Sequence, residues 1–296
     1  MFMNRNSSYR KTKFAESIQI FRCPICKEEM EVHEFKDMVC RKGHNFNIAR
    51  KGYINFLLKA VKTDYDKDMF YSRNLINASG FFNPLLETLR NSIIKSIQEK
   101  DLGEVNILDA GCGDGSHIGQ IISKLNEKAN ADVKGFGVDI SKEGILFASK
   151  QYFDILWCVA DLTNLPFASK SFSVILNILS PANYDEFHRV LKDDGMLIKV
   201  VPGKDYLKEL RSIFYQGTEK EEYSNDEVVK LFSNKFKVID TIELKYDHQI
   251  DRDNLIHLIS MTPLSWKVTD DKINKVMDMN IDSISVEFLI IIGQKG

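Results

Sequence analysis

The apolar positions of this chain form two patterns that alternate from about residue 103 onward. Short continuous apolar runs predict buried strands, and stretches with apolar residues every three or four positions predict amphipathic helices. The runs interpreted as strands are residues 106–110, 135–139, 158–162, 173–179, 196–201, 236–246 and 286–293. Helices between strands are typical of an α/β fold with a mostly parallel sheet, here of seven strands closed by a late hairpin.

The segment before this region predicts a linker and two helices. Residues 62–72 are charged and loop-like, and residues 73–80 and 84–99 are interpreted as helices. The second helix has a clear apolar stripe, formed by Leu85, Leu86, Leu89, Ile93, Ile94 and Ile97. Gly80-Phe81-Phe82-Asn83 lies between the two helices.

A glycine-rich turn follows the first strand of the sheet. Asp109 ends the strand, and Gly111, Gly113 and Gly115 alternate with other residues before an amphipathic stretch. Glycine allows a sharp turn with positive φ and a close approach of the backbone to a ligand. The spacing differs from the G-x-G-x-x-G of dinucleotide folds, and the acid precedes the glycines.

Two further acids end the second and third strands. Asp139 closes residues 135–139, and Asp161 follows the third apolar run. Together with the glycine turn, this order resembles class I methyltransferases, which bind S-adenosylmethionine in a Rossmann-like fold. The resemblance implies that Asp139 holds the ribose hydroxyls and that Asp161 faces the adenine amino group.

A second motif lies near the N-terminus. Cys23, Cys26, Cys40 and His44 form C-x2-C-x13-C-x3-H, a spacing that predicts a tetrahedral zinc site. Four protein ligands leave no open coordination position, so the zinc is expected to be structural. His33 falls outside the spacing and is interpreted as a surface residue.

Charge is distributed unevenly along the 296 residues, whose net charge is −2. Residues 1–62 carry 13 Lys and Arg against 6 Asp and Glu, whereas the remainder carries 27 against 36. A basic front end favours a polyanionic partner such as RNA, and Arg50 and Lys51 are candidates to contact it. The chain has no apolar run of bilayer length and no signal-peptide core, which predicts a cytoplasmic protein without a membrane partner.

The boundaries predicted from these signals divide the chain into four parts. Residues 1–20 are expected to be a polar extension that is disordered or forms a loose arm. Residues 21–62 are expected to form a zinc-binding RNA-recognition module with a hairpin at 30–39, and residues 63–102 a linker with helices. Residues 103–296 are expected to form the methyltransferase domain.

Further segments make the resemblance specific. The zinc knuckle is followed by Arg-Lys-Gly-Tyr-Ile-Asn at 50–55, and related segments occur at 179–181, 202–210 and 261–266. This set resembles the large-subunit ribosomal RNA guanine-N1 methyltransferases, the RlmA/RrmA family. The resemblance implies methyl transfer from S-adenosylmethionine to N1 of a guanine in a hairpin loop of 23S rRNA. It leaves open which of two neighbouring guanines is modified, and it allows a homodimer.

The resemblance also implies cofactor-binding positions. The glycine turn supplies Cys112 and Gly113, and the flat rings are Phe82, where other members have Tyr, and Tyr206, where others have His. Both Phe82 and Tyr206 keep a flat ring, so a ring can still stack on the cofactor at each position. The hydrogen bonds that a Tyr hydroxyl or a His ring would make are absent or altered.

The proton on guanine N1 must be accepted by some group during the transfer. This superfamily places its substrate after the fourth strand, where Asn177, Ser180, Tyr184 and Asp185 are candidates. The sequence does not decide among them. Asp185 also has a non-catalytic interpretation, as a charge that complements a helix N-terminus.

Two other functions remain open at this point. An enzyme with the same cofactor and a small-molecule acceptor would fit the core, although the zinc knuckle and the basic front end argue against it. A non-enzymatic RNA-binding protein that kept the fold would be expected to have lost the glycine turn or Asp139, and both are present.

Overall fold

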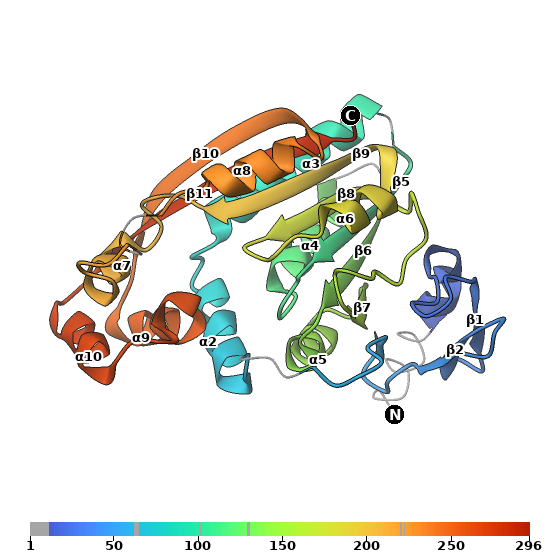
Figure 1. The fold of residues 1–296 in the computed structure, drawn as a ribbon, viewed down its shortest axis with the longest axis horizontal. Coiled ribbons are helices and arrows are strands. Elements are labelled where there is room, and N and C mark those ends of the chain that lie inside the picture. The colour runs from blue at the N-terminus through green and yellow to red at the C-terminus, as the bar shows by residue number, and fades with distance from the viewer. Residues whose placement is uncertain (1–11, 62–64, 101, 129–130, 220, 222) are drawn as a thin grey trace.

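The computed structural model describes residues 12–61, 65–100, 102–128, 131–219, 221 and 223–296. A sheet of eight strands in the order β10-β11-β9-β8-β5-β6-β7-β4 runs through the molecule (Figure 1). Neighbours from β9 to β4 are parallel, and β11 is antiparallel to both β9 and β10. The strands are β4 (Tyr53–Asn55), β5 (Glu104–Ala110), β6 (Asp132–Asp139), β7 (Ile155–Val159), β8 (Phe172–Ile178), β9 (Leu191–Pro202), β10 (Lys237–Gln249) and β11 (Ser283–Gln294). The predicted mostly parallel α/β fold is confirmed.

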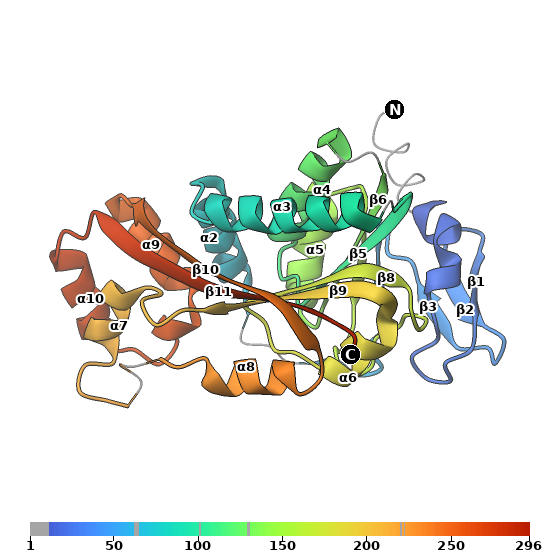
Figure 2. The ribbon, with the colours of Figure 1, turned by 90° about the horizontal axis from the view of Figure 1, so that it is seen from above.

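Helices cover both faces of the sheet, which Figure 2 shows edge-on. α3 (Asn83–Lys100), α4 (Ser116–Lys128) and α5 (Lys142–Gln151) lie on one face, and α6 (Tyr184–Val190) and α8 (Asp226–Ser233) on the other. A further group of helices gathers beyond one end of the parallel strands: α2 (Lys67–Ala78), α7 (Lys208–Phe214), α9 (Arg252–Met261), η2 (Pro263–Ser265) and α10 (Asp270–Asp278).

The two faces of the sheet belong to two hydrophobic clusters. Along β5, Ile107 packs in the cluster with α3 and α4, whereas its neighbour Leu108 packs in the opposite cluster. This alternation follows the two-residue period of a strand. Both residues are fully buried, which explains why the sequence shows a continuous apolar run rather than an alternating one.

The N-terminal part forms a small antiparallel sheet of β1 (Met30–His33), β2 (Asp37–Cys40) and β3 (Asn45–Asn47). The predicted hairpin at 30–39 is therefore present. Phe21 links this part to the main sheet, with its ring centroid 5.4 Å from that of Phe167 and 6.4 Å from that of Phe136. The zinc module and the sheet thus share one hydrophobic cluster.

An eighth strand was not predicted. β4 pairs in parallel with β7, with Tyr53 opposite Trp157, so the end of the predicted module 21–62 belongs to the main sheet. The pairing joins segments far apart in sequence, and β4 has only three residues. Local periodicity carries no signal for such a strand.

The expectation of a disordered or loose N-terminal arm is wrong for residues 12–20. Residues 12–16 are helical, η1 (Ile18–Ile20) follows, and Phe14 is buried with its ring centroid 5.9 Å from that of Phe21. The apolar packing of Phe14 and Ile20 and an ion pair between Lys13 and Asp154 hold this otherwise polar segment. Residues 1–11 lie outside the described residues.

The predicted linker at 62–72 ends earlier than expected. α2 begins at Lys67, because the Asp66 carboxylate caps it by accepting a hydrogen bond of 2.8 Å from the Met69 N–H. Met69 and Phe70 are buried on this first turn, which supplies the packing that the charged sequence conceals. Residues 62–64 lie outside the described part of the chain.

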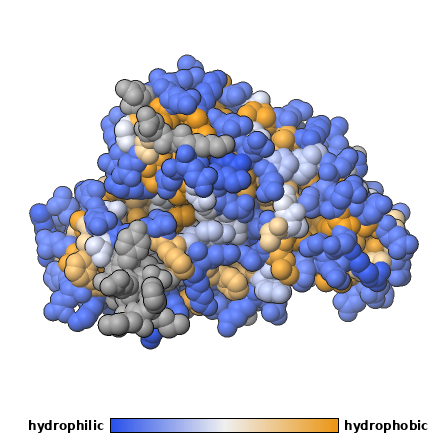
Figure 3. All heavy atoms as spheres, turned by 180° about the vertical axis from the view of Figure 1, so that it is seen from behind, coloured by the Kyte–Doolittle hydropathy of each residue, from blue (hydrophilic) through white to orange (hydrophobic). Residues whose placement is uncertain are grey.

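Hydrophilic residues predominate on the face shown in Figure 3, where hydrophobic residues form small separate patches. Within the described ranges, the helices are all too short or too polar to cross a bilayer.

The direction of the sheet reverses between β5 and β8. From β5 the chain proceeds outward through β6 and β7, and it then returns to place β8 and β9 on the other side of β5. At such a reversal the loops that follow the two central strands diverge and leave a crevice at their carboxyl ends. This crevice is where a ligand is expected.

We predict that Phe21→Ala lowers the free energy of unfolding by about 3–5 kcal/mol, because it empties a site in contact with four other rings. Urea denaturation followed by circular dichroism measures the change. The control is Phe35→Ala, whose ring is 49% exposed and which should change stability by less than about 0.5 kcal/mol. Equal effects of the two substitutions would contradict the shared cluster.

Candidate active site and metal centre

A cavity of about 1040 Å³ opens at the carboxyl ends of the central strands. Its wall includes residues 111–114 after β5, residues 161–163 after β7, residues 178–184 after β8 and residues 199–202 of β9. The cavity therefore occupies the crevice at the sheet reversal. Its size is at the upper end of the range for small-molecule sites, which leaves room for more than one ligand group.

The glycine turn is fastened to the second strand of the cavity wall. The N–H groups of Gly111 and Cys112 both donate to the Val138 carbonyl, at 2.8 and 3.0 Å. Asp139 accepts at 2.8 Å from the Gly113 N–H with one oxygen and at 2.8 Å from the Ser141 N–H with the other. Burial raises the pKa of Asp139, although these two hydrogen bonds act in the opposite direction.

Gly111 is required by both its conformation and its surroundings. Its φ is +84°, and a Cβ at this position would lie 1.8 Å from the Ser180 Oγ. Leu179 also adopts a left-handed φ, of 51°, which turns the chain after β8. Such backbone conformations cost about 1–3 kcal/mol and concentrate at functional sites. The turns after β5 and β8 are thus in direct contact.

The structure brings most of the predicted cofactor residues together. The predicted residues that line the cavity are Phe82, Gly111, Cys112, Gly113, Asp139, Asp161 and Tyr206. Phe82 and Tyr206 are both buried, and each packs against the ring of Phe288. These two rings form one apolar side of the cavity.

Asp109 and Gly115 do not line the cavity. Asp109 is fully buried, and burial, followed by the nearby acids Asp139 and Asp114, raises its pKa to about 8. A Cβ on Gly115 would lie 2.4 Å from the Trp157 ring, so close packing explains this glycine. Both residues therefore lie behind the cavity wall and not on it.

The four candidate proton acceptors separate into two pairs. Ser180 and Tyr184 line the cavity, whereas Asn177 and Asp185 do not. The Asn177 side-chain amide donates to the carbonyls of Ala110 and Pro181, and its oxygen accepts from Lys199. Asn177 is thus fully used in holding the turns together.

Asp185 lies on the surface. It forms an ion pair of 2.6 Å with Lys235, and its side chain is exposed. It occupies the first turn of α6, where a negative charge complements the helix dipole. This placement fits the interpretation of Asp185 as a charge that complements a helix N-terminus.

The sequence interpretation missed three cationic residues on the cavity wall. Arg73, Lys199 and Arg211 line the cavity, and none of them forms an ion pair within the described ranges. Arg211 is 6% exposed and stacks over the Tyr223 ring at 5.1 Å. Lys199 has a local signal that could have revealed it, because it interrupts the apolar run of β9.

His117 was also missed. It lines the cavity against the Phe82 ring, and its buried Nε2 has no hydrogen-bond partner among the described residues. Burial, and then the charge of Arg73, lowers the pKa of His117 to about 3. The ring is therefore neutral at physiological pH and is a weak base.

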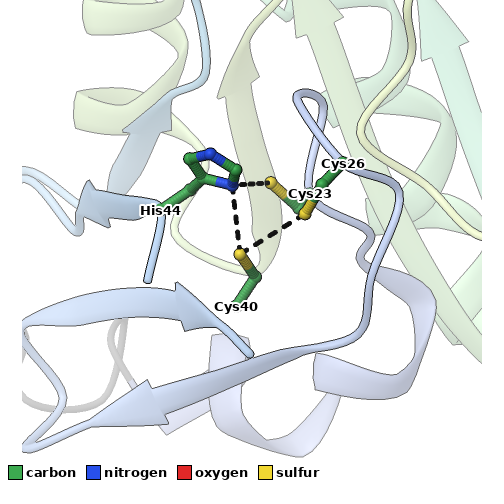
Figure 4. Close-up of side chains that lie close together, drawn as sticks. All are labelled: Cys23, Cys26, Cys40 and His44. Atoms are coloured by element: carbon green, nitrogen blue, oxygen red, sulfur yellow. Dashed lines mark hydrogen bonds between the residues drawn. The ribbon is translucent and has the colours of Figure 1, made fainter. Parts of the chain in front are cut away.

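Cys23, Cys26, Cys40 and His44 converge in the N-terminal part, as Figure 4 shows. Their ligand atoms all lie within 4.8 Å of one another, with sulfur–sulfur and sulfur–nitrogen distances of 3.3–3.5 Å between neighbours. A zinc ion with Zn–S bonds of about 2.3 Å would give a tetrahedron with edges of about 3.8 Å. The four residues therefore fit a closed zinc site, as predicted, and His33 is on the surface.

The metal centre is connected to the cavity wall. The Asn164 side-chain amide donates a hydrogen bond of 3.1 Å to the Pro24 carbonyl, between the first two ligands. Lys27, which follows the knuckle, donates to the Asn164 oxygen. Asn164 follows the wall segment 161–163 directly, so the knuckle supports that segment.

Two family models match the chain. Residues 21–62 match a model described as RlmA, N-terminal, and residues 107–195 match a model described as Methyltransferase domain. These are the segments that contain the zinc ligands and the first strands of the sheet. The zinc-ribbon match and the ligand geometry agree on structural zinc, and the methyltransferase match indicates S-adenosylmethionine as the methyl donor.

Two relatives align over most of the chain. YxjB of Bacillus subtilis, named provisionally as a 23S rRNA (guanine-N1)-methyltransferase, is 41% identical over 93% of this chain and 97% of its own. The 23S rRNA (guanine(748)-N1)-methyltransferase of Streptomyces fradiae is 26% identical over 86% of this chain and 89% of its own. Among solved structures, the YcgJ protein of Bacillus subtilis is 19% identical, with a TM-score of 0.43 over 70% of this chain and 97% of its own.

We predict that Cys23→Ser removes the bound zinc and lowers the melting temperature, because the metal holds together a module whose sheet has only three strands of three or four residues. Elemental analysis gives the zinc content, and calorimetry gives the melting temperature. His33→Ala is the matched control, since its side chain is 57% exposed and lies outside the ligand set. One equivalent of zinc in Cys23→Ser, or loss of zinc in His33→Ala, would refute the assignment.

Proposed function

The chain belongs to the family of 23S rRNA (guanine-N1)-methyltransferases, and we propose that it methylates N1 of a guanine in a hairpin loop of 23S rRNA. The observation that carries this proposal is the convergence of three separate segments at one cavity. Residues 179–181, 202–210 and 261–266 carried the resemblance in the sequence, and each contributes residues to the cavity wall.

S-adenosylmethionine supplies an activated methyl group, so the protein's task is largely to hold and align the reactants. We propose that the Asp139 carboxylate accepts hydrogen bonds from the ribose hydroxyls of S-adenosylmethionine, and that Asp161 faces its adenine amino group. Cys112, Gly113, Phe82 and Tyr206 would surround the remainder of the molecule.

Arg73 is suited to the methionine carboxylate. Its guanidinium lies against the glycine turn, 2.6 Å from the position that a Cβ on Gly113 would take, and the φ of +55° at Gly113 favours glycine there. The cation has no ion pair of its own in the described ranges, which leaves it available for a carboxylate.

The target base would enter on the other side of the cavity, beside Ser180, Pro181 and Tyr184. Guanine N1 lies on the Watson–Crick edge, so the base must be unpaired or flipped out of its helix to be reached. Arg211 sits on this side among tyrosine rings. We propose that it contacts an acceptor group of the target nucleotide.

The basic N-terminal part would contact the surrounding RNA. We propose that residues 21–62 form the recognition module, with Arg50 and Lys51 exposed in the turn before β4. Residues 103–296 would form the catalytic domain and residues 63–102 the connection between the two parts. Because its substrate would be ribosomal RNA, we propose that the protein acts in the cytoplasm. That it forms a homodimer stays a prediction.

We predict that one 1-methylguanine of 23S rRNA disappears when the gene is deleted, and that plasmid expression restores it. Mass-spectrometric mapping of the rRNA from both strains measures this and identifies the nucleotide. An unchanged methylation map, with transfer to a metabolite extract instead, would favour a small-molecule acceptor.

We predict that Asp139→Ala weakens S-adenosylmethionine binding at least tenfold, because it removes a carboxylate from the cavity and frees the Gly113 N–H. Isothermal calorimetry measures the affinity, and circular dichroism checks the fold. Asp132→Ala is the control, because this residue lies exposed at the opposite end of the same strand. Unchanged affinity in Asp139→Ala would contradict the assigned role.

A further inference from the structure

Methylation of guanine N1 requires a proton acceptor, and the preceding description leaves that role open. Guanine carries a proton on N1 at neutral pH, and the proton must leave as the new bond forms. Assigning this proton acceptor rests on the proposed function, and the fold fixes the geometry of one residue suited to the role.

Lys199 is a lysine buried in the middle of the sheet. It lies on β9 between Asn177 of β8 and Ile291 of β11, is 4% exposed, and lines the cavity. Its Nζ donates one hydrogen bond to the Asn177 side-chain oxygen, at 2.5 Å, and one to the Ser180 carbonyl. The amine is therefore held directly behind the turn that contacts Gly111.

The two hydrogen bonds fix the orientation of the amine. A neutral lysine amine has two N–H groups and one lone pair, and the two oxygens here accept both N–H groups. The remaining tetrahedral position on Nζ is left for a lone pair, or for a third proton. Asn177 cannot turn away, because its own amide donates to Ala110 and Pro181.

The surroundings favour the neutral form of this amine. Both acceptors are uncharged, and no carboxylate forms an ion pair with Lys199 in the part of the chain that the structure describes. Burial lowers the pKa of Lys199 to about 8, and no neighbouring charge contributes to the shift. A positively charged sulfonium in the same cavity would favour the neutral amine further.

The other titratable groups on the wall are less suited to accept this proton. Both carboxylate oxygens of Asp139 accept hydrogen bonds from backbone N–H groups, and the Asp114 carboxylate accepts one from the Ser116 hydroxyl. The low pKa of His117 makes its ring a weak base. Burial raises the pKa of the tyrosines, which keeps their hydroxyls protonated. These are Tyr184, Tyr206 and Tyr223.

Among the described residues, the acids that remain form no hydrogen bond to the Ser180 turn, unlike Lys199. Asp161 accepts a hydrogen bond from the Thr163 N–H on the side assigned to adenine, and Glu219 is exposed in the segment after α7. Arg73 and Arg211 are permanently protonated and cannot accept a proton. On the cavity wall, Lys199 has both features that a base needs here. Its neutral amine carries a lone pair, and the same amine is hydrogen-bonded to the Ser180 carbonyl.

We propose that Lys199 is the catalytic base that accepts the N1 proton of the target guanine. In this step the N1–H bond breaks and an Nζ–H bond forms. The N1 electron pair forms the bond to the methyl carbon as the carbon–sulfur bond breaks. The positive charge lost at sulfur reappears on the Lys199 ammonium, so the total charge in the cavity is unchanged. The ammonium then releases its proton to solvent.

The experiment measures single-turnover methyl transfer to unmodified 23S rRNA between pH 6 and 9.5. For the wild type, the rate should rise tenfold per pH unit and level off above about pH 8, where the amine is neutral. Lys199→Met should lower the rate by about 10²–10⁴-fold. Lys199→Arg keeps the hydrogen-bond donors and should be equally slow, with the rise in rate between pH 6 and 8 lost.

Two controls separate this role from a structural one. Lys192→Met, on the same strand but outside the cavity wall, should behave as the wild type. Calorimetry should show S-adenosylmethionine affinity within threefold of the wild type in both Lys199 variants, which shows that the cavity is intact. Primary amines added to the solution should restore methyl transfer by the Lys199→Ala variant, and more basic amines should give faster transfer.

A rate and pH profile of Lys199→Arg equal to those of the wild type would overturn the proposal while leaving the function intact. The same conclusion would follow if amines gave no rescue of Lys199→Ala. If the wild type itself transfers no methyl group to 23S rRNA, the proposed function fails instead.

Discussion

The reversal of strand order between β5 and β8 is the constraint on which the site depends. Because the loops after these two strands diverge, the sheet itself leaves a crevice that neither set of covering helices can fill. Gly111 and Ser180 then meet at the floor of the crevice, where a side chain larger than hydrogen on the first residue would displace the second. The same Ser180 that contacts Gly111 accepts a hydrogen bond from Lys199 through its carbonyl, so the glycine turn and Lys199 meet at one place in the crevice.

Charge is distributed unevenly around the crevice. The acids Asp114, Asp139 and Asp161 lie after β5, at the end of β6 and after β7, with the cation Arg73 of α2 beside them, whereas Lys199 and Arg211 come from β9 and α7. One half therefore complements a cationic sulfonium compound and the other a nucleotide rich in oxygen acceptors. Burying an unpaired cation such as Arg211 is unfavourable, so its presence on the wall indicates a partner that arrives from outside.

The parts of the structure that could be predicted from sequence are those with local signals. The seven strands, the glycine turn and the four zinc ligands depend on periodicity, positive φ and ligand spacing, all of which are visible within a few residues. The strand β4 and the burial of Phe14 depend on contacts with distant segments, which no local pattern records. Asp109 and Gly115 show a related limit, because they belong to the predicted motif but do not line the cavity.

The parallel pairing of β4 with β7 also bears on the order in which the chain can fold. Tyr53 leaves the ribosome well before its partner Trp157, and at about 5–20 residues per second the interval is on the order of ten seconds. During that interval the N-terminal segment has no sheet to join, although all four zinc ligands have already been synthesised. Early metal capture would give the nascent segment a fixed shape, to which the later strands could add as they emerge. Zinc supply during translation would then influence the yield of folded enzyme.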